Sequence, residues 1–409
     1  MKTAWLAKTI ATMNPDVDDQ YGLLTNHAII TEGPKIMAVV PSDKVNEYVR
    51  GGEIHTFKDE LITPGFIDCH THLVFGGDRA GEWEERLNGV SYTEIAQRGG
   101  GIKSTVNATR AASFDKLYDH SLKRLKAMMA EGVTTVESKS GYGLDMASEK
   151  KLLEVTAALK EKNDIDISPT LLAAHSLPVE YAGRSDEYID LIINEMMPEF
   201  WKLGLFEAVD IWTENIGFNL EQTDRLFMAA AKLGIPVKAH AEQLSNIGGS
   251  GLVAKYDGLS TDHIEHLDEE SIRQLSRART VATLLPMAFY FLKDTKAPPV
   301  DLLRKYQVPM AVSTDFNPGT SPFSSIRMAM NMACTLFGLT PAEAMAGVTR
   351  NAAQALGREN RQGQIKLGFE ANFAVWDVER PVEIFYELGY NPLKSRIFNG
   401  EYKGRQPRR

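Results

Sequence analysis

Short apolar runs rich in β-branched residues alternate with longer segments of helical spacing between about residues 60 and 340. Strands that alternate with helices in this way predict parallel pairing, and the commonest closed arrangement is a (β/α)8 TIM barrel of class α/β. An open, doubly wound sheet uses the same alternation, so the pattern favours the barrel without excluding the sheet. The eight runs cover residues 66–72, 133–138, 168–175, 208–214, 235–240, 259–266, 280–286 and 308–315.

The segments after the first three runs predict helices over residues 114–132, 148–162 and 188–204. The first and third end in glycine, which is common just past a helix, and Ser148 is a candidate N-cap for the second. The glycine-rich stretch GGGIKST at residues 99–105 lacks the spacing of a phosphate-binding loop, so we expect a mobile loop there.

The two ends of the chain carry short β-type runs with turn residues between them. Within residues 363–379 the pattern predicts two short strands around a glycine-containing turn. Chain ends often meet, and both ends carry enough Val, Ile and Phe to need a partner surface. We therefore expect residues 1–60 and 360–409 to form one small β-sandwich domain beside a barrel domain of residues 61–359.

The composition narrows the function classes. The chain has 409 residues, with 45 Lys and Arg against 54 Asp and Glu, and a net charge of −9 argues against nucleic-acid binding. Its two cysteines, Cys69 and Cys334, cannot form a disulfide framework and suit a reducing cytosol. The N-terminus does not read as a secretory signal, and the longest uncharged apolar run, 281–292, is too short to span a bilayer. We expect a soluble cytoplasmic protein with no membrane partner.

Polar residues fall at the carboxyl ends of the predicted strands, where the chemistry of a barrel sits. Alternate side chains of a strand share a face, so the two histidines of the HTH sequence point the same way. Six such groups on one rim predict a metal-centred site. They are His70, His72, His175, His240, His263 and Asp315.

The chemistry of these side chains suggests which of them hold the ion. His70, His72, His240 and Asp315 supply three nitrogens and one oxygen, a set suited to one Zn²⁺ or Fe²⁺ ion with room for a water. Asp315 is also placed to accept a proton from that water, and His263 to orient it or carry its proton.

Several motifs together resemble the amidohydrolase superfamily, and within it the cyclic-amide hydrolases of histidine degradation. They are PGFIDCHTHLVFGGDR at residues 64–79, VESKSGYGL, KAHAEQLSN, TDHIEH and STDFNPGTSP, in that order along the chain. The resemblance implies a distorted barrel with a composite β-sandwich, one divalent metal ion and a homodimer. It also implies a small-molecule substrate, 4-imidazolone-5-propanoate, hydrolysed to N-formimidoyl-L-glutamate.

The resemblance also assigns roles to single residues. It implies the same four metal ligands, makes His263 the water-activating residue with Asp315, and gives Gln243 a place in catalysis and in substrate binding. Arg79 is chemically apt for a propanoate carboxylate. The other implied substrate contacts are Tyr92, Tyr142, His175, Asn317, Gly319 and Thr320.

Two positions leave the chemistry open. Gln243 stands where some relatives carry glutamate, and an amide cannot transfer a proton as an acid does. We expect the neighbouring Glu242 to point elsewhere, which leaves Asp315 or His263 to protonate the leaving nitrogen. Lys139 follows the second strand, whereas the carboxylated lysine of binuclear amidohydrolases lies further along the barrel, so we expect one metal ion.

Two other functions fit the same scaffold. A deaminase acting on a purine, pyrimidine or related ring is the nearer alternative, and the carboxylate-binding Arg79 weighs against it. A non-catalytic, amidohydrolase-like assembly protein is the remoter one, because such proteins typically lose ligands that are all present here.

Overall fold

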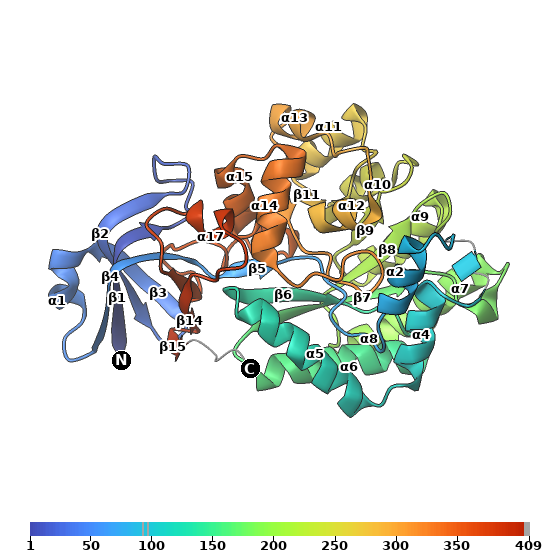
Figure 1. Cartoon of the computed structure of the whole chain (residues 1–409), viewed down its shortest axis with the longest axis horizontal. Helices are drawn as coiled ribbons and strands as arrows, with labels where there is room; N and C mark the ends of the chain where they lie inside the picture. Colours follow the sequence, from blue (N-terminus) through green and yellow to red (C-terminus); the bar gives the residue numbers. More distant parts are fainter. Residues whose placement is uncertain (92–93, 96–97, 405–409) are drawn as a thin grey trace.

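The computed structural model describes residues 1–91, 94–95 and 98–404, and it has two parts (Figure 1). A barrel surrounded by helices occupies one side of the molecule, and a seven-stranded sheet built from both ends of the chain occupies the other. The substrate contact expected at Tyr92 lies outside the described residues.

The barrel confirms the alternation seen in the sequence. Its eight strands are all parallel and pair in chain order, and each lies within or overlaps one of the eight apolar runs. The strands are β5 (Phe66–Asp68), β6 (Val133–Lys139), β7 (Asp166–Ala174), β8 (Ala208–Thr213), β9 (Lys238–Ala241), β10 (Ser260–His263), β11 (Val281–Leu284) and β12 (Met310–Val312).

The barrel closes between its first and last strands through the residues just beyond them. The amide of Asp315 donates to the carbonyl of His70 at 3.0 Å, and the amide of His72 donates to the carbonyl of Phe316 at 2.9 Å. Asp68 at the end of β5 accepts from the amide of Thr314 at 3.1 Å and from its hydroxyl at 2.7 Å. This closure brings the two ends of the metal-ligand set together.

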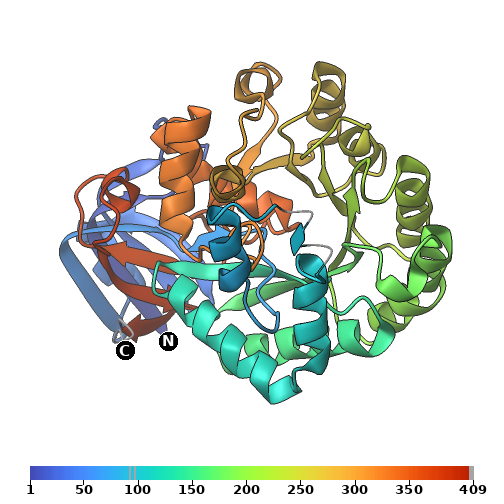
Figure 2. The same cartoon turned by 45° about the vertical axis from the view of Figure 1, so that its right-hand side comes forward.

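Most of the helices form a ring outside the strands, whereas α2 (Ala80–Leu87) lies over the mouth of the barrel (Figure 2). The barrel part also contains α4 (Ile102–Ala111), α5 (Phe114–Met129), α6 (Met146–Lys162), α7 (Ser185–Leu191), the π-helical stretch Ile192–Met196, α8 (Met197–Lys202), α9 (Leu220–Lys232), α10 (Gly249–Lys255), α11 (Glu269–Ala278), α12 (Pro286–Leu292), α13 (Val300–Lys305), α14 (Ile326–Phe337), α15 (Pro341–Gly347) and α16 (Arg350–Ala355).

Two local predictions about the helices were wrong. The N-cap of α6 is Asp145, whose carboxylate accepts from the amide of Ser148 at 2.7 Å, so Ser148 lies inside the first turn. The stretch 99–105 is not a loop throughout, because α4 begins at Ile102, directly after Gly101 with its φ of 77°. Thr105 and Val106 on that helix are buried, and this burial stabilises the first turn that the glycines alone disfavour.

The second part is one sheet in the order β15-β14-β13-β4-β1-β2-β3. The sheet curls, so that Ile36 near one end and Ile397 near the other share a core with Trp5 of the central β1. Its strands are β1 (Lys2–Ala11), β2 (Leu23–Glu32), β3 (Lys35–Pro41), β4 (Glu53–Pro64), β13 (Phe373–Trp376), β14 (Leu393–Phe398) and β15 (Glu401–Gly404). Two short helical pieces, η1 (Ser42–Lys44) and α1 (Val45–Tyr48), follow β3, a third, η2 (Val179–Tyr181), precedes α7, and α17 (Glu383–Tyr386) lies between β13 and β14.

Only one of the two strands expected within residues 363–379 is present, namely β13. The residues before it form a turn against β3, where Ile36 donates to the carbonyl of Phe369 at 2.9 Å and accepts from Gly368 at 2.8 Å. Ile365 and Phe369 enter the core of the sheet, which satisfies their hydrophobic pattern without a strand. In the described part of the chain, no helix has the length and apolar character that a bilayer crossing requires.

Candidate metal centre and substrate site

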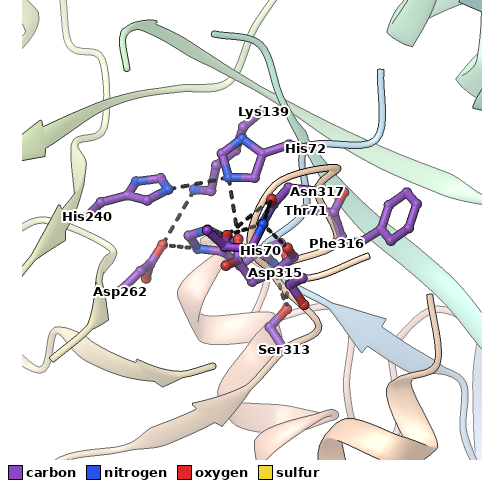
Figure 3. Close-up of polar contacts among 12 residues, drawn as sticks. His70, Thr71, His72, Lys139, His240, Asp262, Ser313, Asp315, Phe316 and Asn317 are labelled. Atoms are coloured by element: carbon purple, nitrogen blue, oxygen red, sulfur yellow. Dashed lines mark hydrogen bonds and ion pairs between the residues drawn. The ribbon is translucent and has the colours of Figure 1, made fainter. Parts of the chain in front are cut away.

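Four side chains from three strand ends meet at one point inside the barrel mouth (Figure 3). The Nε2 atom of His70 lies 3.3 Å from Oδ1 of Asp315, and Nε2 of His72 lies 3.5 Å from the same oxygen. Nε2 of His240 lies 3.4 Å from Nε2 of His72. The alternation expected along the HTH sequence is present, because Cys69 instead packs with Ala352 and Ala353 of α16.

The separations of these atoms fit a bound cation. Two ligands about 2.0–2.1 Å from a tetrahedral ion are about 3.3–3.4 Å apart. Nε2 of His70 is buried and receives no hydrogen bond from the described residues. The Nε2 atoms of His72 and His240 face each other, and a cation between them satisfies both lone pairs.

Two aspartates that the sequence analysis missed fix the orientation of the imidazoles. Nδ1 of His70 donates to Oδ2 of Asp262 at 2.7 Å, and Nδ1 of His240 donates to Oδ1 of Asp210 at 3.2 Å. Because a carboxylate only accepts, these contacts place the proton on Nδ1 and leave Nε2 free as a ligand. The available signal was weak: Asp210 is a single acidic residue in the largely apolar β8, and Asp262 lies in the short polar strand β10, directly before His263.

The carboxylate of Asp315 is held in its charged form. Burial alone would raise its pKa, but the contacts with His70 and His72 outweigh burial and keep the pKa of Asp315 well below the ordinary value. The residue also has a φ of 51°, an uncommon conformation outside glycine. Such strain often marks a functional position.

His263 lies beside these residues without being one of the four. Its ring centroid is 5.5 Å from that of His240 and 5.8 Å from that of His70. Burial lowers the pKa of His263 to about 3, so the imidazole is neutral at neutral pH. Its φ of 82° turns the chain sharply at the end of β10. His263 and Asp315 together with His70 form a second group of close ligand atoms.

His175 and Tyr142 form an aromatic wall over His72. The His175 ring stacks on that of His72 with centroids 4.9 Å apart, and the Tyr142 ring lies 5.3 Å from His175. Burial raises the pKa of Tyr142, which keeps its hydroxyl as a hydrogen-bond donor. Glu149 holds the loop that carries Tyr142 in place, because its carboxylate accepts from the amides of Gly143 and Leu144 at 2.7 and 2.8 Å.

Arg79 lies at the edge of the site, beside the loop that follows Asp315. Its Nε donates to Glu82 at 2.9 Å, and a Cβ added at Gly319 would lie only 2.2 Å from its Nη1. Arg79 and Asn317 line a cavity of about 700 Å³ whose walls include Trp83 and Phe291. The site therefore offers a guanidinium beside an open, largely aromatic space.

The side chain of Asn317 is committed to its own loop. Its Oδ1 accepts from the amides of Gly319 and Thr320 at 2.8 and 2.7 Å, and its Nδ2 donates to the carbonyl of Asp315 at 2.7 Å. These contacts shape the turn against which the Arg79 guanidinium lies.

Glu242 points away from the metal centre, as expected. It accepts from the amides of Gly249 and Ser250 at 2.8 and 2.9 Å, at the start of α10. Gln243 is half-buried in the turn that follows β9. Glu214 anchors that turn by accepting from the amide of Leu244 at 2.8 Å.

The structure brings together His70, His72, His240 and Asp315, with His263, His175 and Tyr142 around them, and places Arg79 on the rim. A parallel barrel with such a cluster at its mouth defines a metal-dependent hydrolase of the amidohydrolase class. The amidohydrolase family model matches residues 61–404, and the chain belongs to that family.

Within this family the chain belongs to the imidazolonepropionases. It is 57% identical over 396 residues to the imidazolonepropionase of Photorhabdus laumondii, covering 97% of this chain and 95% of that one. It is 55% identical to the imidazolonepropionase of Salmonella schwarzengrund, covering 98% of each chain.

Solved structures with a similar fold are more distant in sequence. An adenosine deaminase from Xanthomonas campestris with bound zinc superposes with a TM-score of 0.75 at 19% identity, over 98% of this chain and 93% of that one. An E. coli guanine deaminase superposes with a TM-score of 0.71 at 15% identity, over 98% of both chains. At these identities the likeness describes the fold alone.

Proposed function

We propose that this protein hydrolyses 4-imidazolone-5-propanoate to N-formimidoyl-L-glutamate, a step of histidine degradation. The observation that carries the proposal is the series of close contacts that joins the four side chains. Nε2 of His70 and Nε2 of His72 lie 3.3 and 3.5 Å from Oδ1 of Asp315, and Nε2 of His72 lies 3.4 Å from Nε2 of His240. The identity to imidazolonepropionases supports the choice of substrate. Water adds to the ring carbonyl carbon, the C–N bond to the ring nitrogen breaks, and that nitrogen takes up a proton.

The four converging residues would hold one divalent ion, Zn²⁺ or Fe²⁺. When bound, such an ion polarises the ring carbonyl and makes a water acidic near neutral pH. Asp262 and Asp210 keep the imidazoles of His70 and His240 turned toward the ion through the Nδ1 contacts at 2.7 and 3.2 Å.

The remaining residues bind the substrate and move protons. Arg79 binds the propanoate carboxylate, because its guanidinium faces the cavity on the rim and forms a charge-assisted pair with an anion. Tyr142, His175, Gln243 and the loop with Asn317, Gly319 and Thr320 enclose the ring. Neutral His263 and charged Asp315 are the groups placed to accept the proton of the attacking water and return it to the leaving nitrogen. Gln243 orients the ring by hydrogen bonding.

The test is the absorbance decay of imidazolonepropionate with protein before and after treatment with a chelator. We expect turnover that is lost with the metal and restored by Zn²⁺ or Fe²⁺. Full turnover by metal-free protein, or none by metal-loaded protein, contradicts the proposal. Release of ammonia from purines or pyrimidines would instead favour a ring deaminase. A cytoplasmic location, expected from the composition, and a homodimer, implied by the resemblance, belong to the same proposal. Light scattering of the purified protein tests the dimer.

A further inference from the structure

Lys139 lies beside the metal-binding histidines, and one of its contacts is with Asp262 (Figure 3). Two further carboxylates, Asp210 and Glu137, also face its amine. Nζ of Lys139 is 2.6 Å from Oδ2 of Asp210, 3.0 Å from Oε2 of Glu137 and 3.4 Å from Oδ2 of Asp262. All four side chains have no exposed surface. A buried cluster of this kind is costly unless every charge is paired, so its composition calls for an explanation.

Two of the three carboxylates are the ones that orient the metal-binding histidines. Asp262 receives both the His70 Nδ1 contact and the Lys139 contact on one oxygen, Oδ2. Asp210 receives His240 on Oδ1 and Lys139 on Oδ2. The Lys139 ammonium is therefore linked to two metal-binding imidazoles. Asp262 connects it to His70, and Asp210 connects it to His240.

Asp210 and Asp262 both depend on the Lys139 ammonium. The second oxygen of Asp262, Oδ1, is buried and accepts no hydrogen bond from the described residues. Without the Lys139 ammonium, Lys238 would still pair with Glu137, but Asp210 would lose an ion pair at 2.6 Å and Asp262 a contact at 3.4 Å in a buried space, so both carboxylates would move. A displaced carboxylate releases the imidazole that it holds, because the orientation of a metal-binding histidine depends on its Nδ1 partner.

The contacts also decide which form Lys139 takes. The three carboxylates outweigh burial and hold the pKa of Lys139 well above its ordinary value, so the amine stays a cation. Carboxylation needs a neutral amine and produces an anion, which would add a fourth negative charge to the cluster. Three carboxylates within 3.4 Å of Nζ thus favour the ammonium form of Lys139 over a carbamate.

We propose that Lys139 is a positioning residue for the metal centre. Its ammonium fixes Asp210 and Asp262, which in turn fix His240 and His70, and it occupies the space among the carboxylates that a second divalent ion would need. The inference rests on the ligand set given under the proposed function.

The test measures Zn²⁺ affinity by competition with a chromophoric chelator, and the absorption spectrum of the Co²⁺-loaded protein, which reports the coordination geometry. Lys139→Met should weaken Zn²⁺ binding by about 10–100-fold, the usual effect of losing support behind a metal ligand, and alter the Co²⁺ spectrum. Lys238→Met is the comparison variant. Lys238 is also buried, pairs with Glu137 at 2.7 Å and helps to hold the charge of Asp262, but among the described residues it forms no ion pair with Asp210. Its loss should therefore weaken Zn²⁺ binding less than the loss of Lys139.

A double-mutant cycle tests the route through Asp210. Asp210→Asn alone should weaken Zn²⁺ binding, and Lys139→Met combined with Asp210→Asn should weaken it by less than the product of the two single effects. Lys139→Gln is the substitute if the methionine variant cannot be purified.

Unchanged affinity and spectrum in the Lys139 variant, an equal loss in Lys238→Met, or independent effects in the cycle would overturn the inference. Failure of the proposed function would give a different result. In that case the ligand assignment would be wrong, and wild type and His240→Ala would bind the same amount of Zn²⁺.

Discussion

The Nε2 atoms of His72 and His240 lie 3.4 Å apart, although 168 positions separate the two histidines in the chain. Asp210 accepts from the other nitrogen of His240, so Nε2 carries a lone pair. A direct contact between two nitrogens at this distance contributes little stabilisation, whereas a cation bound to both would contribute much more. This relationship ties the fold of the barrel to the chemistry at its mouth.

Removing one ligand should therefore remove the activity. His240→Ala and Asp315→Asn should each lower turnover of imidazolonepropionate by more than about 100-fold, since the loss of a ligand exceeds the usual loss of an outer partner. Turnover and metal content are measured on the same samples. His27→Ala, in the seven-stranded sheet, is the control that should change neither. Wild-type turnover with intact metal content in Asp315→Asn would show that the ligand assignment is wrong.

Arg79→Ala should raise KM by about 10–100-fold and leave kcat within about threefold. A hydrogen bond to a charged group contributes about 1.5–3 kcal/mol, and Arg79 makes its contact with the carboxylate arm rather than with the reacting bond. Arg184→Ala is a close control, because Arg184 forms a salt bridge with Glu187 at the same i,i+3 spacing and the same 2.9 Å distance on an exposed helix. An unchanged KM in Arg79→Ala removes the residue from the substrate site.

Gly319→Ala tests the position of the same guanidinium from the other side. The added methyl group would lie 2.2 Å from Nη1 of Arg79 and must displace it. We expect KM to rise about tenfold, roughly the effect of losing 1.4 kcal/mol of binding, while the melting temperature changes little. Gly81→Ala is the control, because its Cβ would meet no atom within 4 Å. Equal KM values for the two variants would mean that the Arg79 side chain can move aside without weakening substrate binding.

Glu265→Gln should stabilise the fold at neutral pH. Burial raises the pKa of Glu265 well above 4.5, and Asp294, Asp315 and Glu214 add to the shift. The folded state thus keeps a proton that the unfolded state has released, so its stability falls as pH rises above 4.5. The amide removes this penalty.

Thermal denaturation at several pH values measures the effect of the Glu265 substitution. The variant should melt about 1–2 °C or more above wild type at pH 7, with a gap that narrows toward pH 4. Glu47→Gln in the exposed α1 serves as the comparison and should leave the melting temperature unchanged. A lower melting temperature for Glu265→Gln at pH 7 would mean that the carboxylate is charged and paired in the folded protein.

Local patterns were sufficient for the elements of the barrel. Side chains alternate along any strand, so the sequence around His70 and His72 already places both imidazoles on one face. The same reasoning located all eight strands, because each is a short apolar run between helical segments. The exact start of a helix was harder to predict. Asp145 and Ser148 are both residue types that favour the N-cap position, and in the structure Asp145 is the N-cap of α6.

Contacts between distant segments were beyond the reach of the sequence. Nothing near Asp262 or Asp210 indicates that each supports a histidine, since those pairs form only when the barrel closes. The sequence by itself determined the strands, the helices and the side chains able to bind a metal, because hydrophobic periodicity and side-chain chemistry are local properties. The tertiary structure alone decided which atoms converge, which imidazole nitrogen is free and that Lys139 is a paired cation, because burial and charge pairing depend on residues brought together from the whole chain.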